Sequence, residues 1–221
     1  FNIHIQDPKV SLDNFDVVVV PQHDNLNGDN VITTKGAIHY LTNQEIEENK
    51  GYLSSKVKSG KEVVTLILGG PNKYYKYTRE NIENVFLKVS ENFIKNNFQL
   101  IVVPSMRTPK DIIKFANEHY GKDHLVINEV DKKAYLSALG LSKFIVVTCD
   151  SSSMISEAAI TGKPIYVVDI PAIKNDYRFR KFISLFKELN IIRILGSKIE
   201  NWSYEKLDET NRVAREIEKK F

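Results

Sequence analysis

Three serines stand at the predicted start of a helix, directly after a strongly apolar run. Residues 151–153 follow the run Phe144–Cys149, and the pattern over Ser152–Thr161 predicts the helix. Unpaired amides at a helix start attract an anion, which gains roughly 0.3–2 kcal/mol from the helix dipole. The segment therefore predicts a phosphate-binding site, and the alternative is that one serine only caps the helix. The residues expected to line the site are Asp150, Ser151, Ser153 and Met154.

Glu157 lies about one turn into the same predicted helix, on a side that could face the same ligand. Its carboxylate could accept hydrogen bonds from a ribose diol, and each charge-assisted bond contributes about 1.5–3 kcal/mol. In the alternative interpretation Glu157 is solvated. Together the serines and Glu157 indicate a nucleotide-type site at a strand–turn–helix junction.

Gly69 and Gly70 follow a second apolar run, Val63–Leu68. Two glycines let a backbone approach a ligand closely, although a tight structural turn explains them equally well. The pattern is neither a Walker loop nor a GxGxxG fingerprint, so it predicts no dinucleotide site.

Arg107 and Thr108 follow a third apolar run, Leu100–Val103, and precede a helix predicted from Pro109. The guanidinium of Arg107 offers a fork of donors suited to phosphate, beside a hydroxyl and a helix start. A solvated arginine in a turn is the equal alternative.

Candidate bases for proton transfer lie nearer the start of the chain. His23 and Asp24 follow the apolar run Phe15–Pro21, and Asp7 follows the predicted strand Asn2–Gln6. If these strands belong to a separate lobe, the three side chains face a cleft and could act as bases. A histidine in a loop is more often a surface residue, so catalysis is the less common alternative here.

Two other kinds of chemistry receive less support. Cys149 at a strand end could be a nucleophile, but small buried cysteines are common there. Asp24–Asp29 lacks the EF-hand spacing and its terminal glutamate, and no Asp-x-Asp motif is present, so we expect no metal ion.

Strands must alternate with helices to bring these loops together. From Glu62 onward, apolar runs alternate with stretches of helical periodicity, which predicts βαβ units and a parallel sheet. Ligands of such sheets bind at the carboxyl ends of the strands, where all three loops fall. The predicted strands are Val63–Leu68, Leu100–Val103, Leu125–Ile127, Phe144–Thr148 and Ile165–Val168. The predicted helices are Arg79–Lys95, Pro109–His119, Lys132–Leu139, Ser152–Thr161, Tyr177–Leu189 and a last segment from Tyr204 to the end.

The first part of the chain has a different pattern. Three short strands are predicted, and the polar loop Gln22–Asn30 separates the second from the third, Val31–Thr34. A capping box at Thr42 then predicts a polar helix that reaches about Lys58. We therefore predict a boundary between residues 1–59 and 60–221. The chain begins at Phe1 within a strand, which predicts a missing upstream portion; the alternative is an edge strand at a processed terminus.

Composition limits the classes of function. The chain has 221 residues, 42% of them hydrophobic, which is enough for a sizeable core. Its 31 basic and 28 acidic residues are dispersed, and the net charge of +3 gives no support for nucleic acid as a partner. One cysteine excludes an internal disulfide, and no apolar run approaches the roughly 20 residues of a membrane span. We expect a cytoplasmic protein, with peripheral contact at the inner face of the cytoplasmic membrane left open.

Several of these motifs recur together in one known family. The ordered set Gln6-Asp7-Pro8, Phe15–Asp24, Leu68–Pro71, Ser105–Pro109, Val147–Ala158 and Thr161–Pro164 resembles the ELM family, named for mitochondrial fission proteins of plants. Its bacterial members are grouped with glycosyltransferases. The resemblance covers nearly the whole chain, with one departure: the family usually has two adjacent basic residues in the second loop, where this chain has Met106 and Arg107.

The resemblance implies a GT-B-like architecture of two Rossmann-like lobes with a cleft between them. This chain would supply the C-terminal, nucleotide-sugar-binding lobe at 60–221 and only the last strands of the N-terminal lobe. The family's donor-site residues carry over to Gly69, Gly70, Arg107, Ser151, Ser153 and Glu157, with Glu157 on the ribose.

The implied function is transfer of a sugar from a nucleotide-sugar donor to a cell-envelope acceptor, without a metal ion or other cofactor. Helix starts and Arg107 would stabilise the leaving diphosphate. The alternative is a non-catalytic scaffold that keeps the fold, as the fission role of the plant relatives suggests. With most of the acceptor lobe missing, we expect the fragment to be inactive alone. Fold does not decide between the two functions.

Overall fold

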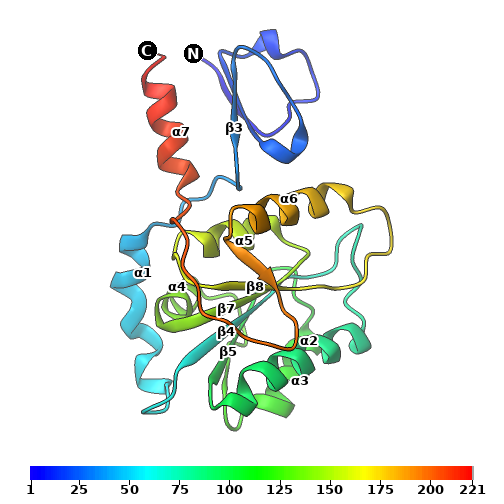
Figure 1. Cartoon of the computed structure of the whole chain (residues 1–221), viewed down its shortest axis with the longest axis vertical. Helices are drawn as coiled ribbons and strands as arrows, with labels where there is room; N and C mark the ends of the chain where they lie inside the picture. Colours follow the sequence, from blue (N-terminus) through cyan, green and yellow to red (C-terminus); the bar gives the residue numbers. More distant parts are fainter. Residues whose placement is uncertain (221) are drawn as a thin grey trace.

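Two parallel sheets organise the chain, which is described over residues 1–220 in a computed structural model (Figure 1). The larger sheet has the strand order β6-β5-β4-β7-β8-β9, and every neighbouring pair is parallel. All residues of the neighbouring inner strands β4 and β5 are buried, as expected for runs of Val, Ile and Leu covered on both faces. The strands are β4 Val63–Leu68, β5 Gln99–Pro104, β6 Leu125–Val126, β7 Ser142–Thr148, β8 Ile165–Val168 and β9 Ile192–Ile194.

Helices cover both faces of this sheet. On one face, Phe86 of α2 and Phe115 of α3 pack edge to face at 5.4 Å within the main core. On the other face, Ala134 and Ala138 of α4 pack against β5. This arrangement explains the alternation of apolar runs and amphipathic stretches in the sequence. The helices are α2 Arg79–Asn92, α3 Lys110–Tyr120, α4 Lys132–Leu141, α5 Ser152–Ala159 and α6 Tyr177–Glu188.

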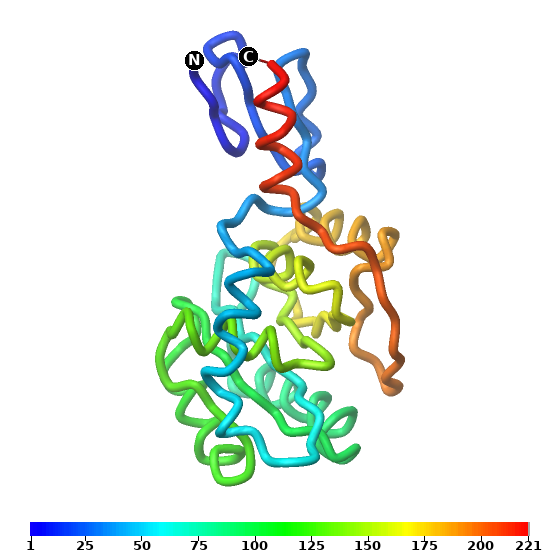
Figure 2. The backbone as a smooth tube through the Cα atoms, turned by 90° about the vertical axis from the view of Figure 1, so that its left-hand side faces the viewer, coloured from blue at the N-terminus to red at the C-terminus, as the bar shows by residue number. Residues whose placement is uncertain are grey.

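The smaller sheet has three parallel strands in the order β1-β2-β3. These strands are β1 Ile3–Ile5, β2 Val17–Pro21 and β3 Val31–Thr34. The last helix, α7 Glu209–Glu218, returns to this sheet, so that the two ends of the chain lie at the same end of the molecule (Figure 2). Val213 of α7 packs on Val17, Val19 and Ile32.

Two connections cross between the sheets. Residues 35–42 lead away from β3, and residues 195–208 lead back toward α7. His39 of the first crossing is bonded to the first turn of α7, since its amide donates to Thr210 Oγ1 at 3.2 Å and its carbonyl accepts from the same hydroxyl at 2.6 Å. The first crossing also contacts α5, where Ala37 N donates to Ser156 Oγ at 2.9 Å. The first crossing therefore connects α7, which packs on the smaller sheet, with the middle of α5, which packs on the larger one.

Segments near both ends of the chain pack away from their sequence neighbours. Helix α1, Asn43–Asn49, begins with the predicted capping box of Thr42 and Glu45 and packs along α4 of the larger sheet. Helix α7 packs on the smaller sheet instead. Each part thus has a helix that packs against the other part, and the boundary between residues 1–59 and 60–221 stays a prediction.

Four details differ from the sequence prediction. The helix predicted to reach Lys58 becomes a 3-10 helix at Lys50–Lys56, where glycine and two serines favour helix propagation poorly. The loop at Gln22–Asn30 contains a 3-10 turn, Gln22–Asp24, closed by a left-handed asparagine. The last helix begins at Glu209 rather than Tyr204, because the Asp208 side chain caps it. Strand β9 was not predicted, since three residues give no clear pattern.

Candidate functional site

The three polar loops at the carboxyl ends of β4, β5 and β7 meet around the carboxylate of Asp150. This side chain is 0% exposed. Its Oδ2 accepts from Gly70 N at 2.9 Å and from Arg107 Nη2 at 3.1 Å, and its Oδ1 accepts from Tyr77 OH at 2.6 Å. A buried charge needs such partners, and here a cation and two further donors supply them. The sequence places these loops together correctly, but it gave no sign of Tyr77.

The two glycines are required by contacts between the loops. A Cβ at Gly69 would lie 2.1 Å from Asp150 Oδ2, and one at Gly70 would lie 2.1 Å from the carbonyl oxygen of Arg107. Neither glycine has a positive φ. Close approach of neighbouring backbone and side chains therefore explains why both positions are glycine, in line with a structural turn.

Thr108 and Arg107 tie the second loop to the first. The hydroxyl of Thr108 contacts the carbonyl oxygens of Leu68 at 2.9 Å and Gly69 at 2.6 Å. Arg107 Nη1 donates to Gly70 O at 2.9 Å, while the side chain remains 41% exposed. One part of the guanidinium fork is thus held by protein, and the rest faces solvent, where it can meet an anion.

The start of α5 presents donors to its surroundings. Ser151 caps the helix, accepting from Met154 N at 3.4 Å, so the capping function predicted for one serine belongs to this residue. Within residues 1–220 the amides of Ser152 and Ser153 donate to no protein acceptor. The Ser153 side chain is exposed, whereas Met154 is buried against the core. An anion placed at these amides would satisfy groups that the fold leaves open.

Glu157 has a protein partner that the sequence did not indicate. Tyr135 of α4 donates its hydroxyl to Glu157 Oε2 at 2.8 Å. Burial raises the pKa of the Glu157 carboxyl, and the bond from Tyr135 opposes this effect in part. Burial, followed by the charge of Glu157, raises the pKa of Tyr135 well above its usual range, so its hydroxyl stays a donor.

A cavity of about 240 Å³ joins His23, in the 3-10 turn after β2, to the start of α5. Lys73, Arg178 and Ser152 are among its lining residues, so two cations border a space that also reaches a helix start. The imidazole of His23 packs edge to face on Phe182 at 5.6 Å. The sequence did not single out Lys73 or Arg178, because neither belongs to a recognisable motif.

His23 is enclosed and favours its neutral form. Its side chain is 8% exposed, and Nδ1 is buried without a hydrogen bond from residues 1–220. Burial lowers the pKa of His23 below its usual value, the neighbouring Asp24 charge opposes this, and Arg178 adds to it. A neutral imidazole at neutral pH can accept a proton.

The two aspartates predicted as bases have cationic partners. Asp24 is buried and forms a two-point pair with Arg178, at 2.5 Å to Nε and 2.7 Å to Nη2. Asp7 is bonded to the backbone and side chain of Lys9, and these bonds lower the pKa of Asp7. Asp7 is not among the residues that line the His23 cavity. The structure thus brings His23 and Asp24 to the edge of α6 and leaves Asp7 outside the cavity.

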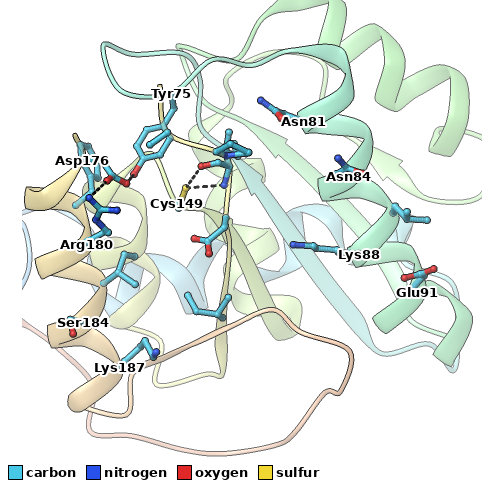
Figure 3. A pocket seen from close by; sticks show the side chains of 18 residues that line it. Tyr75, Asn81, Asn84, Lys88, Glu91, Cys149, Asp176, Arg180, Ser184 and Lys187 are labelled. Atoms are coloured by element: carbon cyan, nitrogen blue, oxygen red, sulfur yellow. Dashed lines mark hydrogen bonds and ion pairs between the residues drawn. The ribbon is translucent and has the colours of Figure 1, made fainter. Parts of the chain in front are cut away.

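A larger groove of about 950 Å³ lies between α2 and α6, and Cys149 is among its lining residues (Figure 3). The Cys149 thiol contacts the backbone of Ile170, whose amide donates to Sγ at 3.2 Å. Burial raises the pKa of this thiol to about 12, so it is protonated at neutral pH and a poor nucleophile. Over residues 1–220 no three His, Cys, Asp or Glu side chains gather in a way that could hold a metal ion.

The two parallel sheets, the two crossings between them and the polar loops at one sheet edge define a GT-B-type α/β protein. The chain belongs to the family described as mitochondrial fission ELM1, whose model matches residues 1–221. The resemblance noted from the sequence motifs is therefore confirmed.

Individual relatives agree with this assignment. The chain is 24% identical over 250 residues to the mitochondrial fission protein ELM1 of Arabidopsis thaliana, covering 100% of this chain and 58% of that protein. It is 30% identical over 209 residues to an uncharacterized protein of Rickettsia prowazekii (strain Madrid E), covering 89% of this chain and 57% of that protein. The chain thus spans less than three-fifths of the length of either relative.

Solved structures support the fold. The UDP co-structure of MnaA from S. aureus superposes with a TM-score of 0.52 at 15% identity, covering 92% of this chain and 52% of that chain. At this identity the likeness concerns the fold alone. None of the helices formed by residues 1–220 has the length and apolar character needed to cross a membrane.

Proposed function

We propose that this chain carries the donor-binding part of a metal-independent glycosyltransferase that uses a nucleotide-sugar and a cell-envelope acceptor. The observation that carries the proposal is the cavity in which the start of α5 meets Lys73, Arg178 and His23. Helix amides and the ammonium of Lys73 favour an anion there, beside an Arg178 that is paired with Asp24, and the anion needs no metal ion to be stabilised. The UDP in the MnaA structure, a protein of the same fold, is in line with a nucleotide ligand.

In this proposal each group has a defined role. The free amides at the start of α5 and the exposed part of Arg107 bind the diphosphate. The Glu157 carboxylate, held by Tyr135, accepts hydrogen bonds from the ribose hydroxyls. His23, neutral at neutral pH, takes the proton from the acceptor hydroxyl as the sugar is transferred. The Asp150 carboxylate does not itself contact the ligand but fixes the three loops relative to one another.

The competing proposal is a scaffold that keeps the fold without turnover. The pairing of Asp24 with Arg178 favours it, because both oxygens of this carboxylate are bonded to the guanidinium rather than directed at an acceptor. The enclosed position of His23 on Phe182 also restricts the access of an acceptor. Under this alternative the cavity would still be polar, but binding of a nucleotide would not be needed.

Thermal unfolding with nucleotides separates the two proposals. The full-length protein would be heated with UDP, GDP, ADP or CMP, and one of them should raise the melting temperature. A ligand at 100 times its dissociation constant stabilises the folded state by about 2.7 kcal/mol. No shift with any of the four would argue against the transferase and for the scaffold.

Variants then test the assigned roles. Glu157→Ala should weaken the bound nucleotide by about 10- to 100-fold, since one charge-assisted bond contributes about 1.5–3 kcal/mol. Glu218→Ala, an exposed glutamate on α7, is the matched control and should leave affinity unchanged. His23→Ala should retain nucleotide binding and lose turnover. Unchanged affinity in Glu157→Ala would show that the ribose assignment is wrong.

A further inference from the structure

A basic surface with exposed apolar side chains lies where the loop before α2 meets the loop before α6. We call residues 71–77 and 171–181 the basic platform. The first segment has two basic residues and no acidic one, and the second has four basic residues and one acidic one. The chain as a whole has nearly balanced charge, with 31 basic and 28 acidic residues. Positive charge is therefore concentrated here, although the overall charge gives no indication of it.

The two segments form one continuous surface. Tyr75 and Ala172 form an antiparallel bridge, and Ile173 N donates to Tyr74 O at 2.8 Å. Tyr75 OH donates to Asp176 Oδ2 at 2.8 Å, and Figure 3 shows these two side chains pointing toward one another. In Figure 1 the corresponding loops, ahead of α2 and α6, lie on the same side of the molecule. These contacts hold the backbones of the two segments side by side, so that their cations belong to one surface.

Most of the positive charge on the platform is not neutralised by the protein. Asp176, its acidic residue, is buried and pairs with Arg180 at 3.0 Å. Arg178 pairs with Asp24, which lies in the 3-10 turn after β2. Among residues 1–220 no carboxylate lies within ion-pair distance of the platform's four lysines. These lysines are Lys73, Lys76, Lys174 and Lys181.

Large apolar side chains are exposed among these lysines. Ile173 is 48% exposed and Tyr177 is 59% exposed. Solvent-exposed aliphatic and tyrosine side chains beside several lysines are typical of surfaces that lie at the interface of an anionic bilayer. Lysines attract the headgroups, while the apolar tips enter the boundary of the acyl region.

The aromatic rings of the platform are less suited to nucleic acid. Lys73 Nζ lies 4.8 Å from the centre of the Tyr74 ring, and Lys181 Nζ lies 4.9 Å from that of Tyr177. A base would have to displace these cations to stack on the covered ring faces. Ile173 offers a base no aromatic face at all. A lipid interface can use the lysines and the apolar tips together, without rearrangement.

We propose that the basic platform docks the protein on an anionic lipid bilayer. The platform shares Lys73 and Arg178 with the lining of the His23 cavity, so docking would bring this cavity close to the membrane surface. The inference does not depend on transferase chemistry, because a scaffold with the same surface would dock in the same way. Binding to vesicles and binding to nucleotides can therefore fail separately.

Vesicle flotation tests the proposal directly. The protein should float with vesicles of phosphatidylcholine and phosphatidylserine, and it should stay unbound with phosphatidylcholine alone or at high salt. Lys76→Gln combined with Lys174→Gln should reduce partition by about 30-fold, since each lysine near an anionic surface contributes about 5-fold. Ile173→Ser should weaken binding further by removing the apolar contact. These side chains are exposed, so we expect the variants to fold like the wild type. Unchanged melting temperatures check this.

A control with equal charge makes the test specific. Lys219→Gln combined with Lys220→Gln removes the same charge from the exposed end of α7, away from the platform, and should retain vesicle binding. Equal losses in both double variants would show attraction by overall charge and overturn the proposal. Tighter binding to single-stranded RNA than to vesicles, lost in the platform variants, would identify a nucleic-acid surface instead. Release from vesicles by soluble glycerophosphoserine would indicate a simple anion site.

Discussion

The Asp150 network and the start of α5 lie side by side at the carboxyl edge of the larger sheet, yet they are built in opposite ways. Asp150 is fully buried, and its oxygens accept from Gly70, Arg107 and Tyr77. At the start of α5, in contrast, the amides of residues 152 and 153 find no acceptor within residues 1–220. The protein itself supplies the hydrogen-bond partners of the first region, whereas the amides of the second can bind a ligand.

This difference separates residues that shape a site from residues that can bind within it. Gly69, Gly70 and Thr108 make contacts between the loops, so they would affect ligand binding only indirectly, through the position of those loops. Glu157, Ser152 and Ser153 are at least partly exposed, and the amides of the two serines have no acceptor within residues 1–220. Arg107 belongs to both regions, because part of its guanidinium is bonded and part is exposed.

Removing the central carboxylate should produce the largest effect. Asp150→Ala would remove the acceptor of the Gly70 amide and of the Tyr77 hydroxyl, and the ion-pair partner of the partly exposed Arg107. A buried donor left without its acceptor costs about 1–3 kcal/mol, so the variant should unfold at lower urea concentration. Asp150→Asn retains the shape and should lose less. Unfolding midpoints equal to that of the wild type would show that the network contributes little to stability.

The sequence predicted the location of this site better than its internal bonds. The run Phe144–Thr148 and the helix after it follow from local apolar patterning, and parallel topology then places the loops at one edge. The bond between Tyr135 and Glu157 and the contacts of Tyr77 with Asp150 join residues far apart in the chain. Single-sequence patterns carry no information on such pairs. The role of Gly69 could not be resolved either, because ligand approach and loop packing both require glycine.

Loss of the Tyr135–Glu157 bond should have an intermediate effect on stability. Glu157 has a protein partner, as Asp150 does, but it is also partly exposed, as the start of α5 is. Tyr135→Phe removes the donor to a half-buried carboxylate and should destabilise the fold by about 1–2 kcal/mol at neutral pH. Burial already raises the pKa of Glu157, and loss of the bond should raise it further. The destabilisation should therefore shrink as the pH falls through this pKa, since protonation removes the buried charge. Denaturant titrations at several pH values measure the destabilisation by Tyr135→Phe. A loss that does not depend on pH would show that it does not come from the bond to the Glu157 carboxylate.

Ser153→Ala should show the smallest effect on stability and the clearest separation of the two regions. Its side chain is exposed and makes no hydrogen bond within the described part of the chain, so the free energy of unfolding should change by less than about 0.5 kcal/mol. Ser151→Ala is the matched comparison in the same loop. It removes the cap that accepts from Met154 N and should cost about 1 kcal/mol. If Ser153→Ala instead destabilised as much as Ser151→Ala, the start of α5 would be a structural cap throughout. The open amides beside it would then be weak support for an anion site, and the contrast with the Asp150 network would lose its functional meaning.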